Sequence, residues 1–424
     1  MSSSCATGPF SDAGAQGVVR AYTVASLFSG AGGMDKGFAD AGFDIVWAND
    51  ISKDAARTYE LNLGHEVETE DIRRIPSDRI APGMDVDVVL GGFPCQGFSV
   101  NNTSRSMEDS RNRLYLEMAR VISDKRPAFF VAENVKGLLS MEKGAVIKAI
   151  IEDFESLGYK VEAKVLNAAR YGIPQARERV IIIGNRLGVE NPFPEPTHRL
   201  DGDEGADLPP AVTTEQAIGF LADVRANACE MRVAGRRVLN HVASTNVSDR
   251  FWARKHDVDQ AEVCDYLREW RSRSGLTVED IDRRLGYAYT AGHWFRKDAS
   301  GSIPSPDDWW SLKGILGFDD RYDALVTELV ERPITFEQSL RITNWDRPSD
   351  TITATCPEIH VNRRRRLSVR ECAILQSFPD DYEFTGSVNS MYRQVGNAVP
   401  PLLARRIAEG IRQALERAEL GGRS

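Results

Sequence analysis

The stretch that decides the fold is Thr23-Val24-Ala25-Ser26-Leu27-Phe28-Ser29-Gly30-Ala31-Gly32-Gly33. Its first part is an apolar run typical of a buried strand, and residues 34–41 after the glycines have helical spacing. A glycine turn between a strand and a helix lets a ligand approach the backbone, where unpaired N–H groups point toward it. Asp35 stands where the dinucleotide-binding pattern G-x-G-x-x-G needs its last glycine, which disfavours a nicotinamide-dependent oxidoreductase.

Two acidic residues follow the next apolar segments. Asp50 comes after the run Ile45–Ala48 and lies 20 positions beyond Gly30. Folds of this kind place there a carboxylate that accepts hydrogen bonds from the ribose hydroxyls. Asp71-Ile72 follow a short run that includes Val67, and we expect them to hold an adenine amino group. The sequence therefore predicts a nucleoside-containing cofactor.

A cysteine follows another predicted strand. The apolar run Val86–Leu90 leads into the turn Gly91-Gly92-Phe93-Pro94-Cys95-Gln96-Gly97-Phe98-Ser99. Cys95 is either a nucleophile or a small, half-buried apolar side chain, because free cysteines commonly pack in that way.

Two further segments place polar side chains at strand ends. Glu133-Asn134-Val135 follow the buried run 127–132, at the edge where open α/β sheets bind ligands; the alternative is a capping or loop-bracing acid. Gln175, Arg177 and Arg179 precede the run 180–183, and strand alternation predicts that they share one face. A salt-bridged sheet edge is the alternative there.

These segments, in this order, resemble the motifs of the C5-cytosine DNA methyltransferases. Residues 366–380 are similar to the family's ninth motif and residues 394–400 to its tenth, where Ala398 replaces a common serine. The resemblance implies an α/β fold: a doubly wound, Rossmann-like S-adenosylmethionine-dependent methyltransferase sheet with a second, smaller target-recognition domain. The implied cofactor contacts are Phe28, Ser29, Gly30, Gly32, Gly33, Asp50, Ile51, Asp71, Ile72 and Asn397.

The resemblance also implies a catalytic set. The thiolate of Cys95 adds to carbon 6 of cytosine, which makes carbon 5 nucleophilic toward the methyl group of S-adenosylmethionine. Glu133 donates a proton at ring nitrogen 3, and Arg179 holds the ring carbonyl oxygen. Arg177 or Arg179 favours the thiolate, and Pro94 completes the catalytic dipeptide. The target base must leave the duplex, so the polar stretch 100–112 is either a loop that closes over DNA or a plain solvated loop.

Length predicts about two domains for 424 residues. We expect a disordered tail (1–20), a catalytic and cofactor-binding domain (21–189), a target-recognition domain (190–360) and a C-terminal segment returning to the catalytic domain (361–424). Residues 258–297 resemble a repressor-like helix-turn-helix or form an ordinary helical insertion.

The net charge of −9 and the pI near 5.4 do not suit a protein that coats DNA nonspecifically, so basic residues must be concentrated locally. The implied DNA contacts are Gln96, Ser99, Arg111, Arg363 and Arg364. Two alternatives are a tRNA cytosine-C5 methyltransferase and a catalytically silent DNA-binding regulator.

Cysteine and histidine spacing predicts no metal site, and no apolar stretch has the length of a membrane span. We expect a monomeric, cytoplasmic, nucleoid-associated prokaryotic protein that acts on double-stranded DNA. A cognate restriction or defence-system partner fits the family, and the target DNA sequence is not encoded in any readable motif.

Overall fold

The computed structural model describes residues 21–94, 114–203, 207–243, 260–287, 291–297, 303–304, 306–327, 341–355, 357–361 and 365–421. Cys95 therefore lies outside the described residues. The same holds for each residue expected to contact DNA, which are Gln96, Ser99, Arg111, Arg363 and Arg364.

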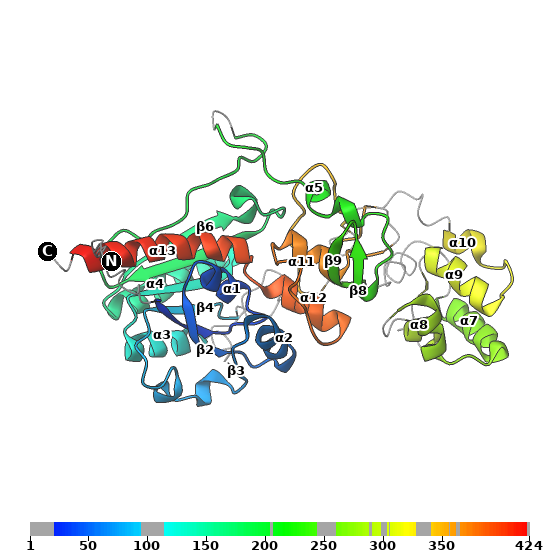
Figure 1. Cartoon of the computed structure of the whole chain (residues 1–424), viewed down its shortest axis with the longest axis horizontal. Coiled ribbons are helices and arrows are strands. Elements are labelled where there is room, and N and C mark those ends of the chain that lie inside the picture. Colours follow the sequence, from blue (N-terminus) through cyan, green and yellow to red (C-terminus); the bar gives the residue numbers. More distant parts are fainter. Residues whose placement is uncertain are drawn as a thin grey trace, which may run out of the picture.

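The described residues form a central sheet of seven strands in the order β3-β2-β1-β4-β5-β7-β6 (Figure 1). Strands β3, β2, β1, β4 and β5 pair in parallel, whereas β7 runs antiparallel to both β5 and β6. The predicted α/β, Rossmann-like sheet is confirmed. The strands are β1 (Thr23–Leu27), β2 (Asp44–Asn49), β3 (Val67–Glu68), β4 (Val88–Gly91), β5 (Phe129–Val135), β6 (Lys160–Asn167) and β7 (Glu178–Asn185).

Helices cover both faces of this sheet because its strands are apolar on both sides. On β4, Val89 packs toward α3 and α4, whereas Val88 and Leu90 pack toward α1 and α13. Each face thus takes alternate residues of the same strand. The helices of this domain are α1 (Gly33–Asp40), α2 (Lys53–Leu63), α3 (Leu114–Lys125), α4 (Ala145–Ser156) and α13 (Pro401–Gly421), with short 3₁₀ turns η1 (Ile72–Arg74), η2 (Ser77–Arg79), η5 (Lys136–Gly144) and η6 (Ala168–Tyr171).

A second, smaller group of elements surrounds an antiparallel hairpin. Helices α11 and α12 lie between this hairpin and the central sheet domain (Figure 1). Their apolar faces share one core with α5 and β9, and that core also includes Ala31 from the glycine turn. The elements are α5 (Thr214–Ile218), η7 (Gly219–Leu221), β8 (Asn227–Val233), β9 (Arg236–Val242), α11 (Val369–Leu375) and α12 (Val388–Asn397).

A third group consists only of helices and lies beyond the hairpin (Figure 1). Its core is formed entirely by residues between 263 and 326. The elements are α7 (Gln260–Ser274), α8 (Val278–Leu285), η8 (Ala291–Phe295), α9 (Pro306–Leu316) and α10 (Asp323–Thr327).

The last helix, α13, packs against α1 beside the glycine turn (Figure 1). A Cβ atom on Gly37 would lie 2.5 Å from the Pro401 carbonyl oxygen and the Ala404 Cβ, so the two backbones touch at this glycine. No helix in the described part of the chain is long and apolar enough to cross a membrane.

Candidate functional site

The glycine turn between β1 and α1 has a backbone that faces open space. Phe28, Gly30 and Gly32 have φ values of 54°, 55° and 82°, which a chain adopts in tight turns. A Cβ on Gly30 would meet no atom within 4 Å, whereas one on Gly32 would lie 2.7–2.9 Å from Leu63, Tyr59 and Tyr382. Gly30 thus borders free volume, and Gly32 is a packing requirement.

Asp50 fixes this turn. Its Oδ2 accepts the N–H of Gly30 at 2.8 Å, and its Oδ1 accepts the N–H of Ser52 at 2.8 Å. Burial raises the pKa of the Asp50 carboxyl despite these two hydrogen bonds. The next side chain, Ile51, is 69% exposed although it is large and apolar. Asn397, at the end of α12, is also exposed.

These observations fit a nucleoside cofactor. The open turn at Gly30, the carboxylate of Asp50 and the uncovered apolar surface of Ile51 lie in succession at the carboxyl ends of β1 and β2. Such an edge combines backbone donors, an acceptor for hydroxyls and a surface for a flat ring.

Asp71 and Ile72 have local structural roles. Asp71 accepts the N–H of Arg73 at 3.1 Å and pairs with its guanidinium, which lowers the pKa of the Asp71 carboxyl. The Ile72 side chain is buried in the core that α3 and α4 cover, and its carbonyl oxygen accepts hydrogen bonds from Arg120 (3.1 Å) and the Ile75 N–H (3.2 Å), so a ligand could meet only its backbone N–H.

Glu133 and Arg179 form an ion pair across β5 and β7. Arg179 Nε lies 2.8 Å from Glu133 Oε1, and both side chains are nearly buried. Burial lowers the pKa of Arg179, and the Glu133 carboxylate opposes that shift. The other carboxylate oxygen, Oε2, faces Gly92, since a Cβ there would be 3.6 Å away.

Asn134 joins the end of β5 to the loop that precedes Cys95. Its Nδ2 donates to the carbonyl oxygen of Phe93 at 3.1 Å, and its Oδ1 accepts the N–H of Val135. Pro94, the last described residue of this loop, follows directly. The structure therefore brings the Glu133 carboxylate and the Gly92–Pro94 segment together.

The strand alternation expected for residues 175–179 is not found. β7 begins only at Glu178, because the N–H groups of Gln175 and Arg177 bond two residues back, to Ile173 and Gln175, in tight turns. Arg177 donates to the carbonyl oxygens of Ile352 (3.1 Å) and Gly396 (2.9 Å). These two contacts link the central sheet domain to the later segments that contain Ile352 and Gly396. Burial lowers the pKa of Arg177.

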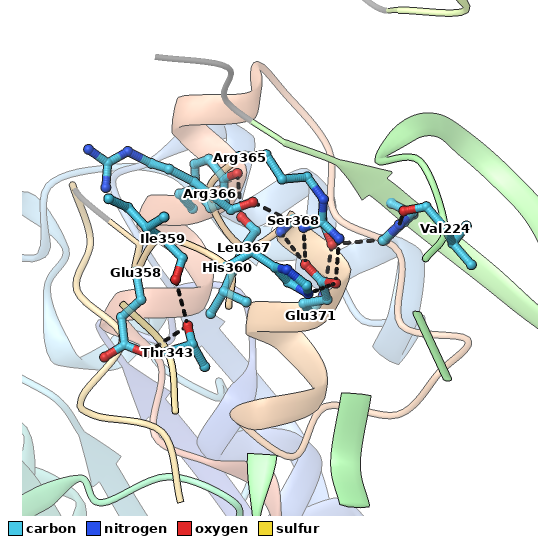
Figure 2. Close-up of polar contacts among 12 residues, drawn as sticks. Val224, Thr343, Glu358, Ile359, His360, Arg365, Arg366, Leu367, Ser368 and Glu371 are labelled. Carbon is cyan, nitrogen blue, oxygen red and sulfur yellow. Dashed lines mark hydrogen bonds and ion pairs between the residues drawn. The ribbon is translucent and has the colours of Figure 1, made fainter. Parts of the chain in front are cut away.

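A buried polar network that sequence reasoning missed lies beneath the hairpin (Figure 2). Arg365 donates to Glu371 at 2.6 and 2.8 Å, and Ser368 Oγ lies 2.9 Å from His241 Nδ1. Although burial would raise the pKa of Glu371, the Arg365 guanidinium lowers it to about 2. The Ser368-x-x-Glu371 spacing is a capping box and was the available signal.

The family model of the C-5 cytosine-specific DNA methylases matches residues 22–413. The type II methyltransferase M.NgoFVII of Neisseria gonorrhoeae is 36% identical over 385 residues, which are 89% of this chain and 83% of that protein. The type II methyltransferase M.AgeI of Thalassovita gelatinovora is 33% identical, covering 92% of this chain and 99% of that protein.

A solved structure assigned as a prophage-encoded DNA modification methyltransferase of E. coli has a TM-score of 0.60 at 23% identity. It covers 93% of this chain and 100% of that one, and it shows the same fold. The protein belongs to the family of C-5 cytosine-specific DNA methylases. It is accordingly an enzyme, a DNA cytosine-5 methyltransferase, as the resemblance predicted.

Proposed function

We propose that this enzyme transfers a methyl group from S-adenosylmethionine to carbon 5 of cytosine within a specific duplex sequence, with Cys95 as nucleophile. The observation that carries the proposal is the Glu133–Arg179 pair beside the Gly92–Pro94 segment. It supplies a carboxylate and a guanidinium, both largely shielded from water, and the carboxylate faces Gly92, three positions before Cys95 in the chain.

Carbon 5 of cytosine is too weak a nucleophile to be alkylated directly. In the proposed mechanism the Cys95 thiolate adds to carbon 6, and the electron pair moves through the ring toward nitrogen 3. Carbon 5 of the resulting enamine attacks the methyl group. A base or water then removes the carbon 5 proton, and the electrons of that C–H bond restore the ring double bond as the thiolate leaves.

Glu133 stabilises the charge that reaches the ring. We assign separate roles to its two oxygens: Oε1 stays with Arg179, and Oε2, which faces Gly92, meets ring nitrogen 3 and shares with it a proton that the carboxylate has taken from solvent before the site closes on the base. A carboxyl group there also accepts from the exocyclic amine, which thymine lacks. We assign the ring carbonyl oxygen to Arg179, and the engagement of Arg177 with backbone carbonyls supports this choice.

The cofactor-holding residues are those of the open turn. We assign the methionine part of S-adenosylmethionine to Phe28, Ser29, Gly30, Gly32, Gly33 and Asn397, the ribose to Asp50, and the adenine to Ile51, Asp71 and the Ile72 backbone. The bound sulfonium supplies an electrophilic methyl group without a metal or a redox change. Asp50 orders the turn by holding the Gly30 N–H, and Gly32 allows close packing of Tyr59 and Tyr382 behind it.

The remaining assignments concern the substrate and its setting. The cytosine must rotate out of the duplex, at a cost of a few kcal/mol, because carbon 6 is hidden in the base stack. We propose Gln96, Ser99, Arg111, Arg363 and Arg364 as DNA contacts, and a monomer acting in the cytoplasm near the nucleoid. The type II relatives favour a cognate restriction enzyme as genetic partner.

The test uses duplexes carrying 5-fluorocytosine at the methylated position, which bisulfite sequencing of DNA from an expressing host identifies first. Fluorine at carbon 5 cannot leave as a proton does, so the thioether should persist. We expect mass spectrometry to find the oligonucleotide on the peptide containing Cys95. Cys95→Ser should form no adduct while it still binds S-adenosylmethionine. An adduct on another residue, or full methylation by Cys95→Ser, would refute the mechanism.

A further inference from the structure

The helical group α7–α10 has no part in the methyl transfer described above, yet it has a hydrophobic core of its own. Its core residues include Tyr266, Trp294 and Trp309, and all members of this core lie between residues 263 and 326. Trp294 and Trp309 are among the largest fully buried side chains of the protein. A core of this size indicates that the group has a fixed shape of its own.

Hydrogen bonds and a cation–π contact join one side of this helical group to the hairpin domain. Arg225, which precedes β8, donates to Asp308 Oδ1 at 3.1 Å, and Asn227 Nδ2 donates to the Leu285 carbonyl oxygen at 3.0 Å. The Arg225 guanidinium also lies over the Tyr287 ring. These contacts engage the end of α8 and the start of α9.

Its first two helices are joined by a short turn, as in a helix-turn-helix, and the 3₁₀ element η8 follows them. Helix α7 ends at Ser274, and the three residues 275–277 lead into α8. Gly275 has a φ of 69°, and Thr277 forms a capping box with Asp280, so both sides of the turn are fixed by local chemistry. Asp282 on α8 then accepts the N–H of Ala291, which positions η8 against α8.

The short element η8 is buried on one side and presents polar groups on the other. Ala291, Trp294 and Phe295 belong to the core. His293 is exposed, and the exposed Arg296 and Lys297 follow directly. Arg284, in the last turn of α8, is exposed as well. Because the core fixes η8 from behind, the backbone that leads into Arg296 and Lys297 has a defined place.

Charge divides this group along the chain. Residues 260–282 contain three arginines against six acidic residues, residues 283–297 contain four arginines and lysines and no acidic residue, and residues 298–327 contain two basic against six acidic residues. In a protein with a net charge of −9, a cationic segment of this kind is a local concentration. A rigid surface bearing Arg and Lys beside a helix-turn-helix is suited to DNA phosphates.

We propose that α7, α8 and η8 form a second DNA-contacting element, which holds the duplex outside the target site through Arg284, Arg296 and Lys297. This inference rests on the proposed function, since it takes duplex DNA as the substrate. The element contributes affinity for flanking DNA and leaves the chemistry of the flipped base unchanged.

The test compares two duplexes that carry the same target, one extended by about one helical turn, roughly 10 bp, on each side. We expect the unmodified enzyme to bind the longer duplex about tenfold more tightly. In R296A/K297A this gain should largely disappear, and the slope of log Kd against log salt should fall by about 1 to 2, as for one or two lost phosphate contacts. Its kcat at saturating DNA and its melting temperature should stay unchanged.

The control variant K148A/R417A removes the same charge from exposed positions on α4 and α13 and should keep the gain. If the unmodified enzyme gains nothing from length, or R296A/K297A keeps the full gain and salt slope, the second contact is refuted. If the unmodified enzyme binds and methylates neither duplex, the proposed function fails instead. If the variant R296A/K297A melts like the unmodified enzyme but no longer binds the longer duplex more tightly, the proposal is supported.

Discussion

Tyr59 donates a hydrogen bond of 2.9 Å to Asp35 Oδ1, and both side chains are completely buried behind the glycine turn. Asp35 lies in the first turn of α1, and Tyr59 comes from α2. The two helices that start at the carboxyl ends of β1 and β2, where we propose that the cofactor binds, are therefore joined by a carboxyl group without access to water. Burial raises the pKa of Asp35 to about 6, and the hydroxyl of Tyr59 counteracts only part of that shift.

This pKa predicts a pH-dependent stability. A carboxyl whose folded pKa exceeds its unfolded value of 3.8 stabilises the fold below pH 4, and that contribution is lost as the pH rises toward 6. Asp35→Asn keeps an acceptor for Tyr59 and cannot ionise. We compare the free energy of unfolding of Asp35→Asn with that of the unmodified enzyme at the same pH. Between pH 4 and pH 7 we expect this difference to shift in favour of the variant by about 2–3 kcal/mol. Urea unfolding at both pH values measures this, and a difference independent of pH would contradict it.

The Glu133–Arg179 pair predicts a loss of rate. Arg179→Ala leaves a nearly buried carboxylate without its cation and removes the group assigned to the ring carbonyl oxygen. We expect kcat to fall about 100-fold or more, and Glu133→Gln to fall similarly, because each removes a partner of the developing charge. Lys164→Ala, at an exposed position on the neighbouring β6, is the control and should retain full kcat. Single-turnover methylation measures all three, and normal turnover in Arg179→Ala would remove that residue from the mechanism.

The network around Glu371 predicts a loss of stability. Glu371→Ala removes the partner of the largely buried Arg365 and the acceptor of the Ser368 N–H. Breaking a buried pair on one side typically costs about 3–5 kcal/mol. Glu152→Ala, which breaks the exposed Lys148–Glu152 pair on α4, should change stability little. Chemical denaturation compares the two, and equal effects would show that burial of the network does not matter.

Two glycine substitutions test the contact between α1 and α13. Gly37→Ala places a Cβ 2.5 Å from the backbone of α13, and we expect a loss of about 1–3 kcal/mol and weaker binding of S-adenosylmethionine. Gly314→Ala in α9 meets no atom within 4 Å and should stabilise its helix by up to about 1 kcal/mol. Calorimetry of both variants, with and without S-adenosylmethionine, decides this. A neutral Gly37→Ala would mean that α13 can move away freely.

The features that sequence predicted were local ones. The apolar run 23–27 followed by glycines predicts a strand and a turn because residue spacing and backbone freedom act over a few positions. Glu133 was placed at a strand end for the same reason, since its carboxylate follows a continuous apolar run. Its ion pair with Arg179 was not predicted, because nothing in the spacing joins the two and the resemblance implied only that each contacts the cytosine.

The features that sequence missed depend on distant partners. Arg177 bonds to a carbonyl 175 positions later in the chain, and Gln175 donates to Leu375 across 200 positions. Nothing in the alternation of residues 175–179 reveals these contacts, so both side chains were assigned to a strand face. The local partner of Asp71 was missed as well, because spacing does not indicate that its carboxylate pairs with Arg73 two residues away; its assignment to the adenine stays a prediction.

The packing of α13 on α1 has a consequence for how the enzyme is made. The packing against α1, behind the glycine turn, is completed by a helix that begins at Pro401, after every other described element in the chain. During translation the glycine turn and the strands β1 and β2 therefore leave the ribosome long before α13, the helix that supports the turn. We therefore expect a nascent chain to hold the methyl donor firmly only after α13 has been made and has packed against α1.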